Sequence, residues 1–265
     1  MDREVIIKAD NVKKKFGDRA ILNGLTLEIY RGETFVIMGG SGCGKSTFLR
    51  HIIGALKPDS GSIHLLGKNL ANVTDDEMDK LKKKIGMCFQ SAALFDSMTV
   101  GENVSLPLRE HTKLDQSVVD IVVKMKLELV GLRGFEDLMP SQLSGGMRKR
   151  VGLARAIVMD PEVVFYDEPT AGLDPIVAGV IDKLILDLSK KLSITSVVVT
   201  HDMKSVFSIA DRVAMLYEGK VLEVGKSEEI KQSKNPMVQQ FIVGNPDGPI
   251  RFFQQKDDYI EQLLK

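Results

Sequence analysis

The sequence predicts an α/β protein built around a parallel sheet, and three short apolar segments carry this prediction. They are residues 35–38, 163–166 and 197–199, each bounded by glycine or polar residues. Continuous apolar runs of this length are typical of strands that are buried on both faces. Segments with helical spacing separate them, so we expect crossover helices between parallel strands.

An antiparallel strand is expected before this core. Apolar residues at positions 25, 27 and 29 alternate with less apolar residues at positions 26, 28 and 30, and Arg31-Gly32 then turns the chain. Alternation with a period of two indicates a strand with one buried face.

A helical segment interrupts the α/β pattern. The strand signal disappears between about residues 94 and 159, where helices are expected to begin near Asp115 and Ser144. A later helix begins at Pro175, because Asp174 can cap it and apolar residues follow at helical spacing.

These patterns divide the chain into three parts. We predict a core formed by residues 1–93 and 160–244, a helical subdomain at 94–159 and a C-terminal extension at 245–265, which is rich in Pro, Gly and Gln. Apolar residues of the extension, among them Phe252 and Phe253, are expected to pack against a surface.

Composition excludes several classes of function. Thirty-six Lys and Arg balance 36 Asp and Glu, so net charge provides no bulk attraction to nucleic acid or anionic lipid. Cys43 and Cys88 form no metal-binding pattern, and reduced thiols fit a cytosolic location. No apolar window approaches the length needed to span a bilayer, so we expect the chain not to enter the membrane by itself.

A phosphate-binding loop follows the first predicted buried strand and precedes an apolar helix. Its glycines allow backbone N–H groups to converge on phosphate, and the helix start adds a positive dipole end. These flanking elements disfavour a glycine-rich turn without ligand. The predicted ATP-binding residues here are Gly39, Gly40, Ser41, Gly42, Cys43, Gly44, Lys45, Ser46 and Thr47.

Three side chains of this loop have separate predicted properties. Lys45 can reach the β- and γ-phosphates, and the Ser46 hydroxyl can bind Mg²⁺. Lys45 and the nearby helix start are also expected to favour the thiolate of Cys43.

Two carboxylates end the second buried strand. We expect Asp167 to hold Mg²⁺ and Glu168 to orient and deprotonate the attacking water. An acidic pair in this position can instead cap the next helix, so the prediction depends on the accompanying phosphate-binding loop.

A second anion site is expected at the start of a cation-rich helix. Ser144, Gly145 and Gly146 place a hydroxyl and free backbone N–H groups there. A plain N-cap with glycines for the turn is the alternative. One nucleotide has little need of two phosphate cradles from the same chain.

In order and spacing, these motifs resemble the ATP-binding cassette (ABC) family over roughly residues 5–235. The resemblance implies a RecA-like P-loop core with an antiparallel β subdomain and an inserted helical subdomain. It implies that Phe16 stacks on adenine, that Gln90 senses Mg²⁺ and water, and that His201 contacts the γ-phosphate. The implied catalytic residues are therefore Glu168, His201 and Gln90, and the implied metal ligands are Ser46, Gln90 and Asp167.

One residue differs from the usual family signature and indicates a subgroup of the family. The family's signature usually ends in glutamine, whereas here it ends in Met147. This Met, together with residues 89–95, 107–112, 139–141 and 247–250, resembles the ATPases of bacterial Mla-type phospholipid transporters. The implied function is ATP hydrolysis that powers phospholipid transport between the inner and outer membranes. Alternatives are the ATPase of a polar-solute importer and a soluble ATPase of iron–sulfur assembly.

The same resemblance implies partners and a location. Two copies form a head-to-tail dimer with two Mg-ATP between them, and the extension reaches across to the neighbouring chain. A permease coupling helix docks near residues 91–104, although the apolar residues there could equally be local core. A small STAS-like subunit on the helical subdomain is a further expectation, and no nucleic acid is expected. The implied location is peripheral, at the cytoplasmic face of the bacterial inner membrane.

Overall fold

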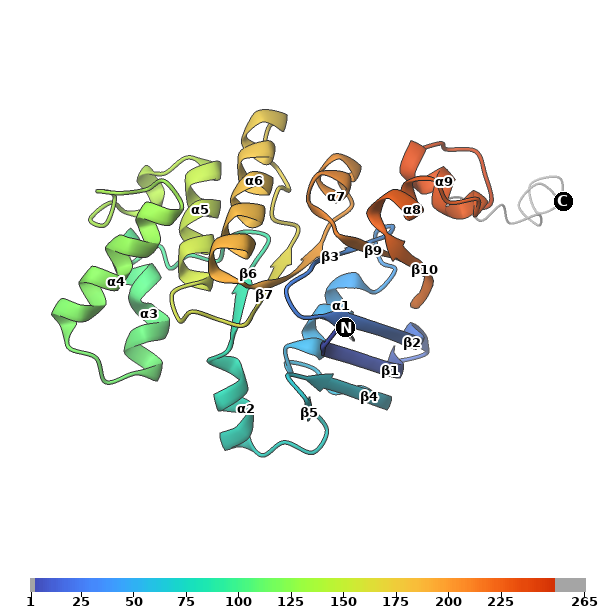
Figure 1. Cartoon of the computed structure of the whole chain (residues 1–265), viewed down its shortest axis with the longest axis horizontal. Helices are drawn as coiled ribbons and strands as arrows, with labels where there is room; N and C mark the ends of the chain where they lie inside the picture. Colours follow the sequence, from blue (N-terminus) through green and yellow to red (C-terminus); the bar gives the residue numbers. More distant parts are fainter. Residues whose placement is uncertain (1–2, 251–265) are drawn as a thin grey trace, which may run out of the picture.

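The structure, a computed structural model, describes residues 3–250 and contains two sheets (Figure 1). The larger sheet has the strand order β10-β9-β3-β8-β7-β6, and the smaller has the order β2-β1-β4-β5. The larger sheet comprises β3 (Thr34–Met38), β6 (Ile85–Cys88), β7 (Val163–Asp167), β8 (Thr195–Val199), β9 (Arg212–Tyr217) and β10 (Lys220–Lys226). The smaller comprises β1 (Val5–Phe16), β2 (Arg19–Tyr30), β4 (Ser60–Leu65) and β5 (Lys68–Asn69).

The α/β prediction is confirmed, and the three apolar segments become neighbouring strands. β8 lies between β3 and β7, and both of its pairings are parallel. β6 and β9 extend the parallel part on either side, and only β10 pairs in the antiparallel direction. The carboxyl ends of β3, β6, β7 and β8 therefore lie along one edge of the sheet.

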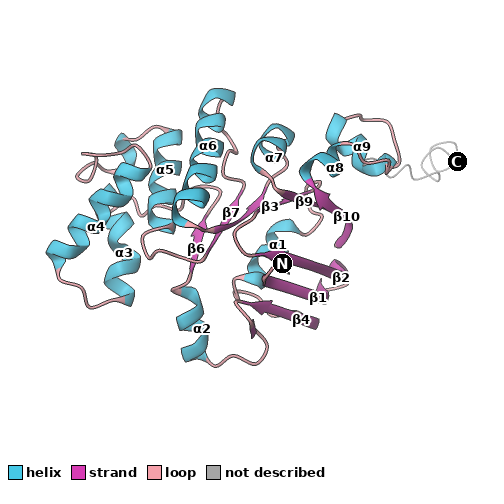
Figure 2. Cartoon of the chain, viewed as in Figure 1, coloured by secondary structure: helices cyan, strands magenta, loops and turns pink. Residues whose placement is uncertain are grey.

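Helices cover the larger sheet and build a lobe at one end of the molecule (Figure 2). α1 follows β3 and packs between the two sheets, where Phe48, Leu49 and Ile52 join their shared core. The helices are α1 (Lys45–Ile52), α2 (Asp75–Lys82), α3 (Val100–His111), α4 (Gln116–Leu129), α5 (Gly145–Ala156), α6 (Pro175–Leu192), α7 (Met203–Ile209), α8 (Ser227–Lys231) and α9 (Pro236–Val243).

The lobe consists of α3, α4 and α5, and no strand lies between residues 94 and 159. α4 and α5 begin where the sequence predicts, with Asp115 and Ser144 at their N-cap positions. α3 was not predicted, because Pro107 lies inside it. The Thr99/Glu102 capping box at its start is the signal that could have found it.

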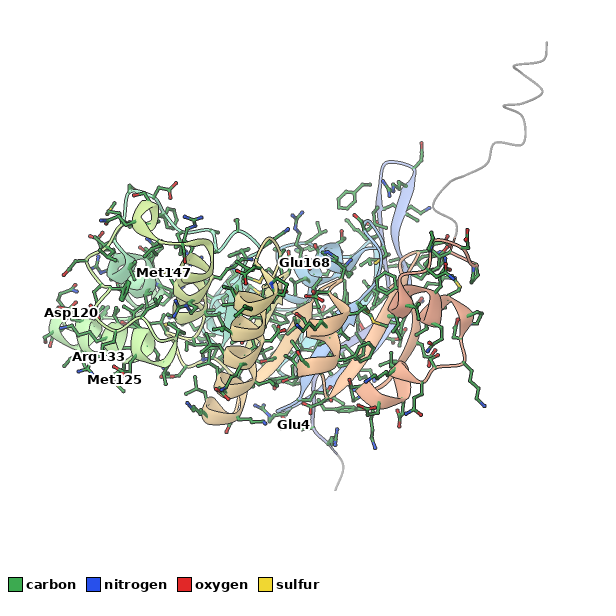
Figure 3. All side chains as sticks on the ribbon, turned by 90° about the horizontal axis from the view of Figure 1, so that it is seen from above. Glu4, Asp120, Met125, Arg133, Met147 and Glu168 are labelled. Atoms are coloured by element: carbon green, nitrogen blue, oxygen red, sulfur yellow. The ribbon has the colours of Figure 1, made fainter. Side chains whose placement is uncertain are left out.

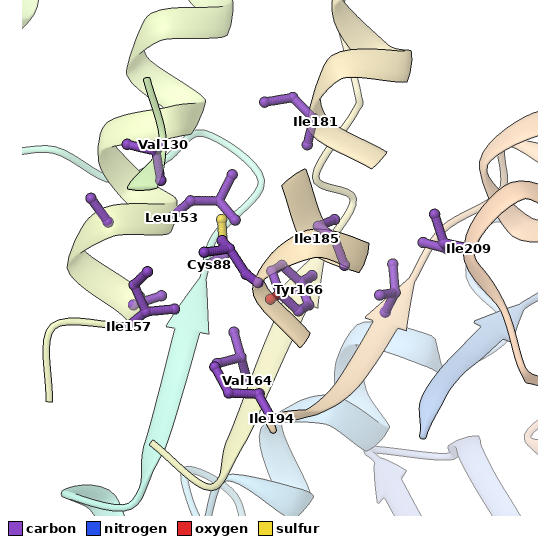
Figure 4. Packing of buried hydrophobic residues seen from close by; sticks show 14 of the residues in the cluster. Cys88, Val130, Leu153, Ile157, Val164, Tyr166, Ile181, Ile185, Ile194 and Ile209 are labelled. Atoms are coloured by element: carbon purple, nitrogen blue, oxygen red, sulfur yellow. The ribbon is translucent and has the colours of Figure 1, made fainter. Parts of the chain in front are cut away.

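The lobe is joined to the sheet through a continuous apolar core (Figure 4). Leu153 and Ile157 come from α5 and its end, and meet Cys88 of β6 and Tyr166 of β7 in the same cluster. Space at this junction is tight: a Cβ added to Gly86 would lie 2.1 Å from the carbonyl oxygen of Ala156. The end of α5 therefore packs directly against the backbone of β6.

The described part of the C-terminal extension folds back onto α9. Gln240 accepts a hydrogen bond from the backbone N–H of Ile250 and donates one to its carbonyl, at 2.7 and 3.1 Å. The residues predicted to clasp a neighbouring chain, including Phe252 and Phe253, lie outside the described residues. Among residues 3–250, no helix combines the length and apolar character needed to cross a membrane.

Candidate nucleotide site

The site is assembled at the carboxyl edge of the sheet from the loops that follow β3, β6, β7 and β8. In open α/β folds, ligands bind at this edge. The loop after β3 closes tightly on its surroundings, because a Cβ on Gly39 would lie 2.4 Å from the carbonyl oxygen of Leu216. Gly44, the N-cap of α1, has φ 106°, which a residue with a side chain rarely adopts. Glycine is thus required at both positions.

Lys45 provides the positive charge of this loop. Its side chain curls over the loop, and Nζ donates hydrogen bonds to the carbonyl oxygens of Gly39 and Gly40 at 2.7 and 3.0 Å. The ammonium thus lies beside backbone amides at the start of a helix, which together form an anion-binding arrangement.

Oxygen atoms of Ser46 and Asp167 lie next to each other at the edge of the sheet. The Ser46 hydroxyl donates to Asp167 Oδ1 at 3.3 Å. Burial raises the pKa of Asp167; the Ser46 hydrogen bond partly offsets this, and the nearby Glu168 carboxylate adds to it. A half-buried carboxylate next to a hydroxyl fits Mg²⁺, which prefers oxygen ligands and keeps several positions for phosphate and water.

Glu168 is held in an unusual backbone conformation. Its φ is 48°, its N–H donates to the carbonyl oxygen of Val199 at 2.8 Å, and its Oε1 lies 2.8 Å from Nδ1 of His201. A non-glycine residue in the left-handed region costs on the order of 1 kcal/mol or more and persists only where neighbours enforce it. The structure therefore fixes both the backbone and the carboxylate of Glu168.

A cleft of about 870 Å³ brings most of the predicted residues together. Its volume suits a small-molecule ligand. The cleft is also lined by Arg19, Ile21 and the end of α9, none of which the sequence indicated. The predicted residues that line the cleft are Gly40, Ser41, Gly42, Gly44, Lys45, Ser46, Thr47, Gln90, Glu168 and His201.

Gly39 and Asp167 adjoin the residues that line the cleft without lining it themselves, and two further groups of predicted residues lie elsewhere in the single chain. Phe16 is 52% exposed at the β1–β2 turn, where Lys14 Nζ lies 5.8 Å from its ring centroid, and it does not line the cleft. Ser144, Gly145 and Gly146 begin α5 in the helical lobe. Figure 3 shows the neighbouring Met147 well to one side of Glu168. The exposed start of α5 is thus separated from the cleft of its own chain.

Cys43 faces a second cavity of about 610 Å³, which it shares with Met215 and Ile250. The expectation of a favoured thiolate was wrong, because burial raises the pKa of Cys43 and outweighs the opposing effect of Lys45.

Lys149 is a residue of the site region that sequence reasoning missed. It is 6% exposed on α5, and Nζ donates to the carbonyl oxygens of Gln90 and Glu168. Burial lowers the pKa of its ammonium. The available signal was its spacing: four and eight positions before Leu153 and Ile157, Lys149 falls on the apolar face of the helix.

The chain is similar to ATP-binding subunits of transport systems. A family model described as ABC transporter matches residues 22–171. The phospholipid transport ATP-binding protein MlaF of Haemophilus influenzae is 44% identical over 260 residues, 98% of this chain and 98% of that protein. The probable ribonucleotide transport ATP-binding protein mkl of Mycobacterium leprae is 40% identical over 258 residues, 97% of this chain and 74% of that protein.

A solved structure extends this similarity. A dimeric ATP-binding cassette in a post-hydrolysis state, bound to ADP and Pi, has a TM-score of 0.76 and 34% identity, and the match covers 83% of this chain and 98% of that chain.

The raised pKa of Cys43 predicts slow, pH-dependent alkylation. Only the thiolate reacts, so labelling by iodoacetamide near pH 7 should be slower than for an exposed thiol and should rise about tenfold per pH unit below the raised pKa. Cys88 is the internal control, because full burial raises its pKa to about 11 and it should stay unlabelled while the protein is folded. Mass spectrometry of the labelled peptides measures both rates. A Cys43 rate that stays constant between about pH 7 and about pH 9 would restore the thiolate expectation.

Proposed function

Because the chain belongs to the ABC transporter family, we propose that it is the ATP-hydrolysing subunit of a membrane transport complex that moves phospholipid. The observation that carries the proposal is that one cleft is lined by the Lys45 loop, by Ser46 and by the hydrogen-bonded Glu168 and His201. Asp167 lies next to this cleft, where it accepts a hydrogen bond from Ser46. A phosphate cradle, a set of oxygen ligands and a base are the components that ATP hydrolysis requires.

Each component has a distinct role in hydrolysis. Lys45 and the amides of residues 39–47 hold the phosphates, and exposed Phe16 supports the adenine from the rim. Ser46, Asp167 and Gln90 would hold Mg²⁺, which neutralises charge on the phosphate oxygens when bound. Glu168 orients the attacking water and accepts its proton.

His201 orients the base and completes the phosphate contacts. Its Nδ1 lies at hydrogen-bond distance from Glu168, which leaves Nε2 to meet the γ-phosphate. The pair thus links the group that activates water to the phosphate that water attacks.

A second copy of the chain completes each site. Ser144 is exposed at the start of α5, away from the cleft of its own chain. In a head-to-tail dimer, the Ser144 hydroxyl and the amides of Gly145 and Gly146 meet the γ-phosphate that the other chain holds. Two ATP molecules then lie between two subunits. The similar dimeric cassette bound to ADP and Pi supports this arrangement.

A groove beside the Gln90 loop suits the permease. It has a volume of about 400 Å³ between the lobe and the core, and exposed Phe89 and Phe95 contribute to it. Val100, in contrast, is fully buried and belongs to the core. The exposed aromatic residues favour docking of an apolar helix from an integral membrane subunit. That partner would place the chain peripherally, at the cytoplasmic face of the bacterial inner membrane.

The outer face of α4 suits a small accessory subunit, such as a STAS-like protein. Val118, Ile121 and Met125 are 41%, 59% and 62% exposed, and together with Leu114 before the helix they follow one helical face. An exposed apolar stripe of this kind marks an interaction surface more often than a solvated one.

Phospholipid is favoured over a polar solute by the extent of similarity. The match to the phospholipid transport protein covers 98% of both chains, whereas the ribonucleotide transport protein extends well beyond the matched part. The proposed transport function also differs from that of an iron–sulfur assembly ATPase, which would have no permease partner.

Replacing Glu168 with Gln tests the base. The amide keeps shape but cannot accept the proton, so turnover should fall roughly 100- to 10,000-fold while ATP binding persists and the ATP-bound dimer accumulates. Phosphate release and gel filtration with ATP measure these effects. Glu162→Gln is the control, because Glu162 precedes the same strand but pairs with Arg31 and Lys84 outside the cleft. Near-normal turnover of Glu168→Gln would remove Glu168 from this role.

Mixing two inactive variants tests the shared site. Lys45→Ala lacks the loop charge and Ser144→Arg blocks the helix start, so each homodimer should be inactive. A mixed dimer should regain part of the activity, because it contains one site with Lys45 from one chain and Ser144 from the other. About half of the sites in the mixed dimers would be intact, because each mixed dimer contains one intact site and one site with both substitutions. Mixtures no more active than either variant alone would contradict the shared-site arrangement.

Purification in mild detergent tests the partners and the substrate. An integral membrane protein and bound phospholipid should co-purify, and Phe95→Glu should lose both by replacing an exposed aromatic side chain of the groove with a charge. Val224→Glu is the control, since Val224 is 42% exposed on β10, outside the groove.

Ile121→Glu should lose only the small accessory subunit that we propose for the outer face of α4. ATP hydrolysis by the reconstituted complex that responds to ribonucleotide rather than to phospholipid would overturn the substrate assignment.

A further inference from the structure

α5 connects two places that serve different nucleotides in the proposed dimer. Its first turn, at Ser144, faces the ATP of the partner. Five residues later, Lys149 points inward, where only 6% of it is exposed. Its Nζ reaches the backbone of this chain's own site, at Gln90 and Glu168. One helix therefore contacts both ATP sites.

The two carbonyls that Lys149 contacts belong to strained or sharply turned segments. Glu168 has a φ of 48°; its N–H donates to the carbonyl oxygen of Val199, and its own carbonyl oxygen accepts from Lys149 Nζ at 3.2 Å. The segment after Gln90 turns through Ala92 and Ala93, whose φ values are 62° and 46°. These conformations are costly and need external support.

Arg155 is a second residue of α5 that supports the segment after Gln90. Its guanidinium donates to the carbonyl oxygens of Ala92 and Ala93 at 2.6 and 2.7 Å. Lys149 and Arg155 thus hold the loop after β6 from two points on one helix. Of these two residues, only Lys149 also contacts the loop that carries Glu168.

The packing of α5 prevents it from sliding past these loops. A Cβ on Gly152 would lie 3.3 Å from the Cβ of Ala92, and the end of α5 packs against the backbone of Gly86. A displacement at the start of such a closely packed helix is transmitted rather than absorbed.

We propose that Lys149 is a positioning residue that couples the two ATP sites of the dimer. When Ser144 docks on the nucleotide of the partner, α5 takes up a fixed position, and Lys149 then sets the backbone of Gln90 and Glu168 for the nucleotide of its own chain. Each site thereby becomes more active when the other is occupied. This proposal rests on the proposed function, because it requires sites shared between two chains.

Lys149→Met tests the coupling in the full-length protein. Methionine keeps the length of the side chain but donates no hydrogen bond, so the two backbone segments lose their common support. We expect kcat to fall roughly 10- to 100-fold, as for other small displacements of catalytic groups. The Hill coefficient for ATP should fall from above 1 toward 1, while the affinity of the Lys45 loop for a fluorescent ATP analogue stays within about twofold of the wild type.

Arg150→Met is the matched control. Arg150 is the next residue on α5 and also donates to backbone carbonyls, those of Val130 and Gly131, but these lie inside the helical lobe. The substitution removes a cation of the same helix without touching either site. It should leave kcat and the Hill coefficient near the wild-type values. Thermal melting of both variants separates loss of fold from loss of coupling.

Lys149→Gln provides a second route if the Met variant folds poorly. Its amide N–H groups can still donate to at least one of the two carbonyls, so cooperativity should be at least partly retained.

The outcomes separate the coupling from the proposed function. A wild-type protein that does not hydrolyse ATP would overturn both. A wild type with a Hill coefficient of 1, a Lys149→Met variant that keeps both kcat and the Hill coefficient, or an Arg150→Met variant that loses them equally would overturn the coupling alone.

Discussion

The parallel direction of β3, β8, β7 and β6 is the constraint on which the site depends. Because these strands point the same way, residues that are far apart in the sequence are delivered to one edge of the sheet. Lys45, Glu168 and His201 come from three different loops, yet their positions are fixed by strands with fully paired backbones. The sheet thus fixes where the site residues lie, while the loops set the final orientation of their side chains.

Charged groups at that edge are partly buried. Asp167 is half-buried next to a hydroxyl, and Lys149 is buried with its ammonium bonded to carbonyl oxygens. Groups in such surroundings interact strongly with an arriving charged ligand, because water screens them poorly. The same groups would be costly in a protein that bound nothing there.

Much of the fold and of the site could be predicted from local sequence patterns. Features that depend on contacts between distant segments could not be predicted in this way. The phosphate-binding loop, the caps of α4, α5 and α6, and the strands that pair around β8 were all visible in short windows of sequence. The wall of the cleft formed by α9 and the contacts of Lys149 were not, because each depends on how helices pack across the sheet. Phe16 shows the reverse case: its proposed role needs a bound nucleotide, and the chain alone leaves its ring at the surface.

The resting position of Lys45 has a consequence for nucleotide binding. Its ammonium donates hydrogen bonds to two loop carbonyls, which helps to hold the loop in its folded shape. A phosphate bound by this loop would exchange hydrogen-bond partners with Lys45 and order little new backbone, which would keep the entropic cost of binding low. In the proposed function, a loop arranged in this way would discriminate little between ATP and ADP. Discrimination would then fall to the step in which two chains close around the γ-phosphate.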